Sequence, residues 1–257
     1  MKNDVVLVFA GEQENVPRLP MSILVLAAYI RQHNFNPVLI DLRKNTQDIS
    51  KIEWDNVLCV GISAMSGPPL LSGIRFSKFV KSKSKGIPVV WGGPHASFFP
   101  EQTVQVEYGD FVIRNEGEKA FLNLLKHLQK GKDPSKVKGL TFMNMGKAVS
   151  TPNEEFEDPE NFPLPAYDLL DVGGYLKGGG NLSYETSRGC PYRCTFCYVH
   201  FFHNHKWRAK SVGKVLSDLD EIAKRYNMGE IKFVEDNMFV DKSRLLEIVN
   251  GMISREF

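Results

Sequence analysis

Residues 56–66 read Asn56-Val57-Leu58-Cys59-Val60-Gly61-Ile62-Ser63-Ala64-Met65-Ser66, an apolar run that ends in small and hydroxyl-bearing side chains. A short, unbroken apolar run of this kind is typical of a β-strand that is buried on both faces. Four further runs in the first half of the chain have the same character, at residues 4–10, 37–41, 87–91 and 110–114. The sequence therefore predicts five buried strands, of which residues 56–62 form one, and Cys59 is expected to be a small apolar residue inside it.

Two segments between and after these strands have the periodicity of helices. Their apolar faces are formed by Ile23, Leu26, Ala27 and Ile30 and by Phe121, Leu124, Leu125 and Leu128. Strands that alternate with crossover helices form a parallel sheet with helices on both faces. We therefore expect residues 1–130 to form an α/β domain, a doubly wound flavodoxin- or Rossmann-like sheet with strand order 2-1-3-4-5.

The pattern changes in residues 131–180. Short apolar runs flank Asn144-Met145-Gly146-Lys147 and predict a small hairpin. Acidic residues and prolines follow, and then Gly178-Gly179-Gly180. This composition is typical of a linker that bridges two domains.

A second α/β pattern begins at residue 181. Strands are expected at 182–187 and 231–234, each followed by a helix. Asp241 is the expected N-cap of the last helix. The apolar stripe of that helix consists of Leu245, Ile248, Val249 and Met252. Residues 181–257 thus hold about two βα units.

The composition argues against several classes of function. Lys and Arg total 32 and Asp and Glu total 30, so the net charge of +2 gives no general attraction to nucleic acid or to an acidic membrane. No apolar run approaches the roughly 20 residues that a transmembrane helix needs. The start of the chain lacks the pattern of a signal peptide. We expect a cytoplasmic protein whose thiols stay reduced.

Three of the four cysteines lie in Glu185-Thr186-Ser187-Arg188-Gly189-Cys190-Pro191-Tyr192-Arg193-Cys194-Thr195-Phe196-Cys197-Tyr198, directly after a predicted strand. Three thiolates in one loop suit a soft metal or an iron–sulfur cluster. Three cysteines on a [4Fe–4S] cluster leave one iron open to another ligand. A structural zinc site takes four ligands. A Cys/His zinc site with His200, His203 or His205 is the alternative, although their spacing matches no common zinc finger.

The spacing Cys190-x3-Cys194-x2-Cys197, with the aromatic Phe196 before the last cysteine, resembles the signature of radical SAM enzymes. The resemblance implies that these cysteines bind a [4Fe–4S] cluster whose open iron chelates S-adenosylmethionine (SAM). Reduction of the cluster would then release a 5′-deoxyadenosyl radical. Phe196 and Tyr198 would lie beside the adenine of SAM.

A second part of the radical SAM pattern is Phe233-Val234-Glu235-Asp236-Asn237-Met238-Phe239-Val240-Asp241. In that family an acidic pair at this strand end helps to bind the amino group of SAM, which assigns Glu235 and Asp236 to SAM binding. Many relatives have two aspartates, whereas this chain has Glu235 in the first position. The resemblance also implies that residues 181–257 are a truncated radical SAM core, the start of a partial TIM barrel.

The loops after the first five strands resemble the cobalamin-binding domain that precedes many radical SAM cores. The segments concerned are Pro17-Arg18-Leu19-Pro20, Gly61-Ile62-Ser63-Ala64-Met65-Ser66, Val90-Trp91-Gly92-Gly93-Pro94-His95 and Arg114-Asn115-Glu116-Gly117-Glu118. The resemblance implies that Ser63, Gly92, Gly93 and Glu116 bind cobalamin, with the glycines letting the backbone approach its nucleotide tail. Residues 11–15 lack the histidine of the Asp-x-His-x-x-Gly motif, so no protein histidine is expected on cobalt.

Taken together, these resemblances imply a cobalamin-dependent radical SAM enzyme that transfers a methyl group to an unactivated carbon of a small-molecule substrate. A radical oxidative cyclase of the anaerobic tetrapyrrole type would use the same parts. A third interpretation is a non-catalytic module that holds cobalamin and a cluster. The expected partner is a low-potential electron donor such as a flavodoxin or ferredoxin, with no nucleic acid and no membrane. A truncated chain is expected to cleave SAM weakly or not at all.

Overall fold

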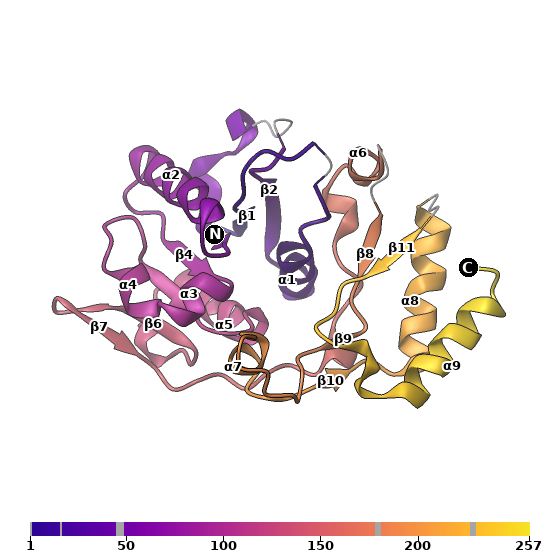
Figure 1. Ribbon diagram of the computed structural model, residues 1–257. Helices are drawn as coiled ribbons and strands as arrows, with labels where there is room; N and C mark the ends of the chain where they lie inside the picture. Colours follow the sequence, from indigo (N-terminus) through magenta and orange to yellow (C-terminus); the bar gives the residue numbers. More distant parts are fainter. Residues whose placement is uncertain (1, 16, 45–48, 178–180, 227–229) are drawn as a thin grey trace.

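The computed structural model describes residues 2–15, 17–44, 49–177, 181–226 and 230–257. A seven-stranded sheet with the order β2-β1-β3-β4-β5-β6-β7, the first sheet, dominates the N-terminal half (Figure 1). Its strands are β1 (Asp4–Phe9), β2 (Asn36–Asp41), β3 (Val57–Ser63), β4 (Val89–Gly92), β5 (Phe111–Ile113), β6 (Leu140–Asn144) and β7 (Lys147–Ser150). The pairs among β1 to β5 are parallel. The predicted α/β class and the predicted order 2-1-3-4-5 are therefore confirmed.

Helices cover both faces of this sheet. They are α1 (Met21–Arg31), α2 (Pro68–Lys83), α3 (Pro94–Phe98), α4 (Pro100–Val104) and α5 (Glu118–Gln129). Successive side chains of a strand point to opposite faces. Accordingly, Val5 and Leu7 of β1 pack in the core that contains α1 and α5, whereas Val6 and Val8 pack in the core that contains α2. Each fully buried aliphatic side chain stabilises the fold by about 1.5–3 kcal/mol.

Cys59 lies in the middle of β3 and is fully buried. It packs with the apolar residues between the first sheet and helices α1 and α5. Burial raises the pKa of its thiol, because the thiolate would lose its hydration. Cys59 therefore has the small apolar role that the sequence predicted.

The predicted hairpin in residues 131–180 is present as β6 and β7, which pair antiparallel. It does not stand apart from the sheet, because β6 also pairs antiparallel with β5, with Ile113 opposite Leu140. The hairpin thus extends the first sheet by two strands, a feature that the interpretation of residues 131–180 as a linker lacked.

The chain after the hairpin runs between the two halves of the molecule. The amide of Ala166 donates a hydrogen bond to the carbonyl of Leu24 in α1 (3.1 Å). The hydroxyl of Tyr167 donates to the carbonyl of Ser183 in the next strand (2.6 Å). The last part of the predicted linker, Gly178-Gly179-Gly180, lies outside the described residues.

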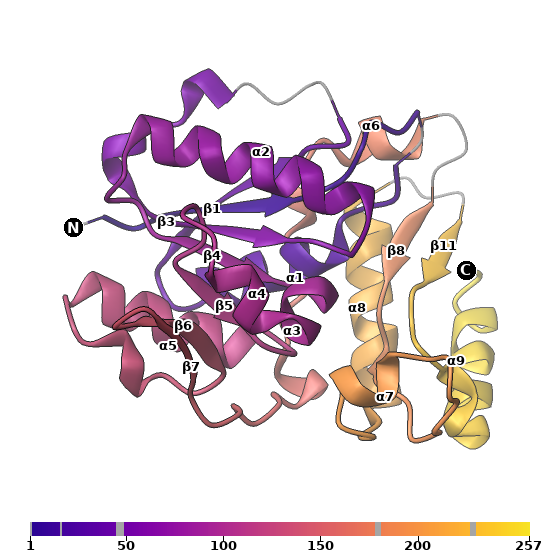
Figure 2. The same cartoon turned by 60° about the vertical axis from the view of Figure 1, so that its left-hand side comes forward.

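The second α/β unit, residues 181–257, lies beside the first sheet (Figure 2). Its elements, with the short helix before it, are α6 (Val172–Leu176), β8 (Leu182–Tyr184), β9 (Ser187–Arg188), α7 (Val199–Phe202), β10 (Arg208–Ala209), α8 (Val212–Arg225), β11 (Ile231–Phe233) and α9 (Lys242–Ile253). β8 and β11 pair in parallel, and β9 and β10 pair antiparallel. Buried side chains of β8 and α8 belong to the same hydrophobic core as α1 and α5, so one core joins the two units.

Helix α9 begins as the sequence predicted, because the carboxylate of Asp241 accepts a hydrogen bond from the amide of Arg244 (2.9 Å). Its apolar stripe differs from the prediction. Ile248 is fully buried, but Val249 is 40% exposed, and the side chain of Arg244 on the same helix is buried. None of the helices in the described ranges is long and apolar enough to cross a membrane.

Candidate functional site

A cavity of about 780 Å³ lies at the carboxyl ends of the parallel strands of the first sheet. One wall includes Phe9, Ser63 and Gly92, at the ends of β1, β3 and β4. The other wall comes from the second unit and includes Glu185 and Tyr198. Ligands of open α/β sheets bind at this edge, and the volume is in the range of small-molecule sites. The cavity is therefore the candidate binding site.

The residues predicted to bind cobalamin all line this cavity, but the two glycines differ. A Cβ atom on Gly92 would meet no atom within 4 Å, so this position leaves open space. Gly93 has a φ of +86°, and a Cβ there would lie 3.0 Å from the carbonyl oxygen of Ala64. Gly93 thus lets its loop pack on the backbone after β3, and the expectation that both glycines make room for a ligand suits Gly92 alone. The Ser63 hydroxyl lies 3.0 Å from that of Ser22.

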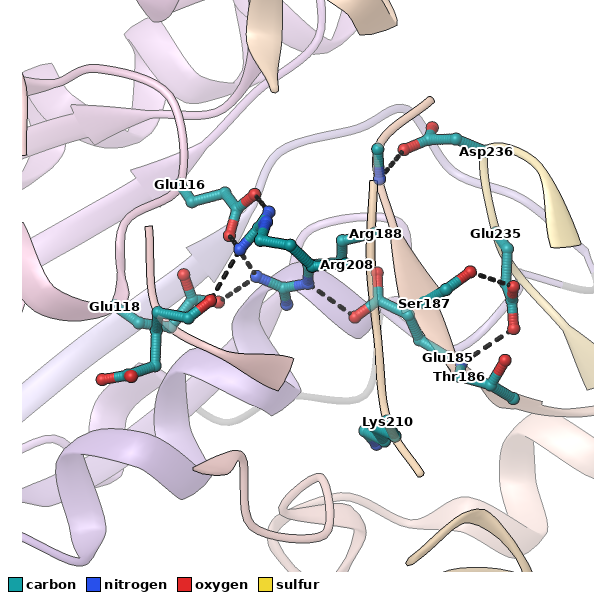
Figure 3. A network of polar contacts seen from close by, with 12 residues as sticks. Glu116, Glu118, Glu185, Thr186, Ser187, Arg188, Arg208, Lys210, Glu235 and Asp236 are labelled. Carbon is teal, nitrogen blue, oxygen red and sulfur yellow. Dashed lines mark hydrogen bonds and ion pairs between the residues drawn. The ribbon is translucent and has the colours of Figure 1, made fainter. Parts of the chain in front are cut away.

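Glu116 also lines the cavity, but its carboxylate is held by side chains of the second unit (Figure 3). It accepts hydrogen bonds from Nδ1 of His203 (2.6 Å), Nη1 of Arg188 (3.3 Å) and Nη1 of Arg208 (3.2 Å). Burial on its own would raise the pKa of Glu116. The hydrogen bond from His203 and the charges of the two arginines outweigh burial and lower this pKa to about 2. Glu116 therefore joins the first sheet to the second unit.

Replacing Glu116 with glutamine is expected to lower the free energy of unfolding at pH 7 by about 3–5 kcal/mol, because Arg208 loses its carboxylate partner and Arg188 and His203 each lose one of theirs. A carboxylate whose pKa is lowered on folding stabilises the fold above its unfolded pKa, and that stabilisation is lost as the pH falls through its folded pKa. The difference between wild type and variant should therefore shrink as the pH falls from about 4.5 towards 2.

Urea unfolding curves from pH 7 down to about pH 2.5 check this expectation, because that range covers most of the window in which Glu116 becomes protonated. The matched control is Glu221→Gln, which removes a half-exposed partner of Arg225 on α8. It is expected to change the free energy of unfolding by no more than about 1 kcal/mol. Equal stability losses in the two variants would contradict the role given to Glu116.

The acidic pair predicted to bind SAM follows β11 and faces the segment that leads to the cysteines (Figure 3). Glu235 accepts hydrogen bonds from the amide of Thr186 (2.8 Å) and from the hydroxyl of Ser187. Asp236 accepts one from the amide of Gly189 (2.9 Å), and its carboxylate lies 3.3 Å from Nε2 of His203. An ionised carboxylate has about four acceptor positions, so both side chains can accept further hydrogen bonds. Their role in SAM binding stays a prediction.

The three clustered cysteines lie in the loop between β9 and α7, and all three are free thiols. Cys194 is exposed, and its carbonyl accepts a hydrogen bond from the amide of Cys197 (3.1 Å). Nδ2 of Asn237 lies 3.8 Å from the sulfur of Cys190. Within the described residues, no three His, Cys, Asp or Glu side chains converge closely enough to hold a single metal ion. Three thiols on one loop fit a larger iron–sulfur cluster, because cysteine thiolates are its usual ligands.

The two aromatic residues predicted to lie beside adenine occupy different places. Tyr198 lines the cavity, and its ring packs edge-on against that of Phe98 (5.8 Å between centroids). Phe196 is 91% exposed and lies outside the cavity wall. The structure therefore brings Tyr198, but not Phe196, to the candidate site.

Sequence reasoning missed three residues that the structure places at the site. The sequence analysis considered His203 only as a ligand of the alternative zinc site, yet it is buried between Glu116 and Asp236. Nothing in its local sequence reveals those partners. Glu185 and Arg188 had a usable signal, since functional residues of α/β barrels lie just after the strands.

A family model described as "B12 binding domain" matches residues 17–125 of the chain. Among curated proteins, an uncharacterized methyltransferase of Pyrococcus horikoshii is 31% identical over 89% of the chain and 51% of the relative. The 4'-phospho-dehydrooxetanocin synthase of Priestia megaterium is 30% identical over 94% of the chain and 34% of the relative. An anaerobic magnesium-protoporphyrin IX monomethyl ester cyclase of Rubrivivax gelatinosus is 24% identical over 92% of the chain and 45% of the relative.

Among solved structures, the chain is similar to the cobalamin-dependent S-adenosylmethionine radical enzyme OxsB with aqua-cobalamin bound. The TM-score is 0.84 and the identity is 28%, over 99% of the chain and 38% of that protein. The chain thus spans about half or less of the length of the relatives that it matches.

Proposed function

The chain belongs to the family of radical SAM enzymes that carry a cobalamin-binding domain, and we propose that its cavity binds cobalamin while Cys190, Cys194 and Cys197 hold a [4Fe–4S] cluster. The observation that carries the proposal is the position of the cavity. Its walls come from the strand ends of the first sheet and from the unit that contains the cysteine loop. One cavity would therefore bring cobalamin and SAM together.

The described residues suit both cobalamin and a [4Fe–4S] cluster. Gly92 leaves open space in the cavity wall at the end of β4. The three free thiols share one loop. When bound, the cluster supplies the electron that splits SAM, and cobalamin supplies a cobalt atom that can carry a methyl group.

The remaining work belongs to side chains of this chain. Glu235 and Asp236 are fixed by hydrogen bonds from residues 186–189, and their remaining acceptor positions would accept hydrogen bonds from the SAM amino group. Tyr198 lines the cavity together with them. Glu116 holds the wall of the first sheet against the second unit through His203 and Arg208.

We propose methyl transfer to an unactivated carbon as the reaction, since one of the relatives is named a methyltransferase. A second candidate is oxidative cyclisation, because another relative is an anaerobic tetrapyrrole cyclase. Either reaction requires a low-potential electron donor such as a flavodoxin or ferredoxin. A module that binds both cofactors without turnover is the third candidate.

Titration of the purified protein with hydroxocobalamin tests the proposal. We expect saturable binding of about one cobalamin per chain, with a change in the visible spectrum as the dimethylbenzimidazole base leaves cobalt. The electron paramagnetic resonance spectrum of the Co(II) form should lack nitrogen hyperfine splitting from a protein histidine. Failure to bind cobalamin would contradict the proposed function, and histidine splitting would contradict the absence of a protein ligand to cobalt.

A further inference from the structure

Glu185 is a cavity-lining carboxylate to which the sequence analysis gave no role. It follows β8 directly, and a quarter of its side chain is exposed. Oε2 accepts a hydrogen bond from Nε of Arg188 (2.8 Å). Within the described part of the chain, Oε1 accepts no hydrogen bond, and it is not sealed from solvent as the buried unpaired oxygens are. One oxygen of Glu185 is therefore anchored and the other is open to a ligand.

Arg188 holds Glu185 in a fixed orientation (Figure 3). Its guanidinium also contacts Glu118 (2.7 Å) and Glu116 (3.3 Å), and it lies 4.5 Å from the ring centre of Phe162. These contacts leave the guanidinium little freedom to turn and cover Oε1. A side chain held in this way loses little rotamer freedom when a ligand arrives, which favours binding.

The carboxylate of Glu185 is less well hydrated than a surface carboxylate, because only a quarter of its side chain is exposed. Burial raises the pKa of Glu185, in spite of the opposing charge of Arg188. A poorly hydrated carboxylate oxygen gains more from a hydrogen bond than an exposed one does. Its place at the carboxyl end of the first strand of the second unit is also where α/β barrels hold ligand-contacting residues.

We propose that Oε1 of Glu185 accepts a hydrogen bond from an N–H or O–H group of the ligand bound in the cavity. The inference rests on the proposed function, which supplies two sources of such donors. Cobalamin carries carboxamide side chains around its corrin ring, and SAM carries an amino group and two ribose hydroxyls. In the first case, the second unit contributes a cobalamin contact from outside the region matched by the cobalamin-binding family model, residues 17–125.

Two variants of Glu185 separate the acceptor from the bulk of the side chain. Glu185→Met keeps the length of the side chain and removes both oxygens. Glu185→Gln keeps an oxygen for Arg188 or for the ligand but removes the charge. The matched control is Glu221→Met on α8, which removes a half-exposed carboxylate of the same unit that does not line the cavity.

Each variant is titrated with hydroxocobalamin and, after anaerobic reconstitution of the cluster, with radiolabelled SAM in equilibrium dialysis. Loss of a charge-assisted hydrogen bond is expected to weaken binding of one ligand by about tenfold or more in Glu185→Met. Glu185→Gln should weaken it by roughly threefold, because a neutral hydrogen bond remains. The ligand that is weakened identifies the donor, and Glu221→Met should bind both ligands like the wild type.

Wild-type affinities for both ligands in the two Glu185 variants would overturn the inference and leave the proposed function intact. If Glu185→Met fails to fold, as judged by its thermal unfolding, Glu185→Gln decides alone, and an unchanged affinity there overturns the inference. If the wild type binds neither ligand, the proposed function fails and this inference fails with it.

Discussion

Gly92→Leu is expected to abolish measurable cobalamin binding while the protein stays folded. Gly92 lines the cavity, and a Cβ atom at this position would enter open space, with no atom within 4 Å. A leucine side chain can therefore be accommodated by the folded chain. It would occupy the space in which the ligand has to lie. A loss of more than about 4 kcal/mol in binding free energy corresponds to about a thousandfold weaker affinity.

The measurement is a hydroxocobalamin titration of wild type and variant, combined with thermal unfolding of each. Gly93→Ala is the control for the unfolding measurement, because this neighbouring glycine does not tolerate a side chain. Its Cβ would lie 3.0 Å from the carbonyl oxygen of Ala64, and its φ is +86°. We expect that control to lose about 1–3 kcal/mol of stability through backbone strain. Wild-type affinity in a folded Gly92→Leu variant would show that cobalamin does not occupy this part of the cavity.

Much of the first sheet could be predicted because its information is local. The buried strand around Val57–Ser63 is a continuous apolar run, and such a run identifies a strand of a parallel sheet without any knowledge of its partners. The order 2-1-3-4-5 was then chosen from the small number of topologies that crossover connections allow. The N-cap at Asp241 was predictable for the same local reason.

The parts that could not be predicted depend on contacts between distant residues. Glu116 and Arg208 are 92 positions apart in the sequence, and neither local context shows that they meet. The pairing of β6 with β5 could not be predicted either, because the sequence pattern of a hairpin is the same whether the hairpin stands alone or extends a sheet. The different roles of Gly92 and Gly93 depend on the position of Ala64, which only the folded backbone supplies.

Cys194→Ala is expected to have the second large effect, the loss of the iron–sulfur cluster. The loop offers three thiols, so the variant would retain two of the thiolates that a [4Fe–4S] cluster requires. Cys194 is exposed, and its replacement by alanine removes no buried contact. The fold should therefore persist, and loss of iron would report on ligation rather than on unfolding.

Cys59→Ala provides the matched control, since it also exchanges a cysteine for an alanine. Cys59 is fully buried in β3, and burial raises the pKa of its thiol, so it is unsuited to bind metal as a thiolate. This variant is expected to assemble the cluster like the wild type.

Iron content after anaerobic reconstitution with iron and sulfide tests the central claim most directly, because the claim depends on the ligands Cys190, Cys194 and Cys197. The account predicts about four irons per chain in the wild type and in Cys59→Ala, with the brown colour of a [4Fe–4S] cluster, and almost none in Cys194→Ala. Equal iron content in Cys194→Ala and the wild type, or a colourless wild type that holds zinc, would contradict it.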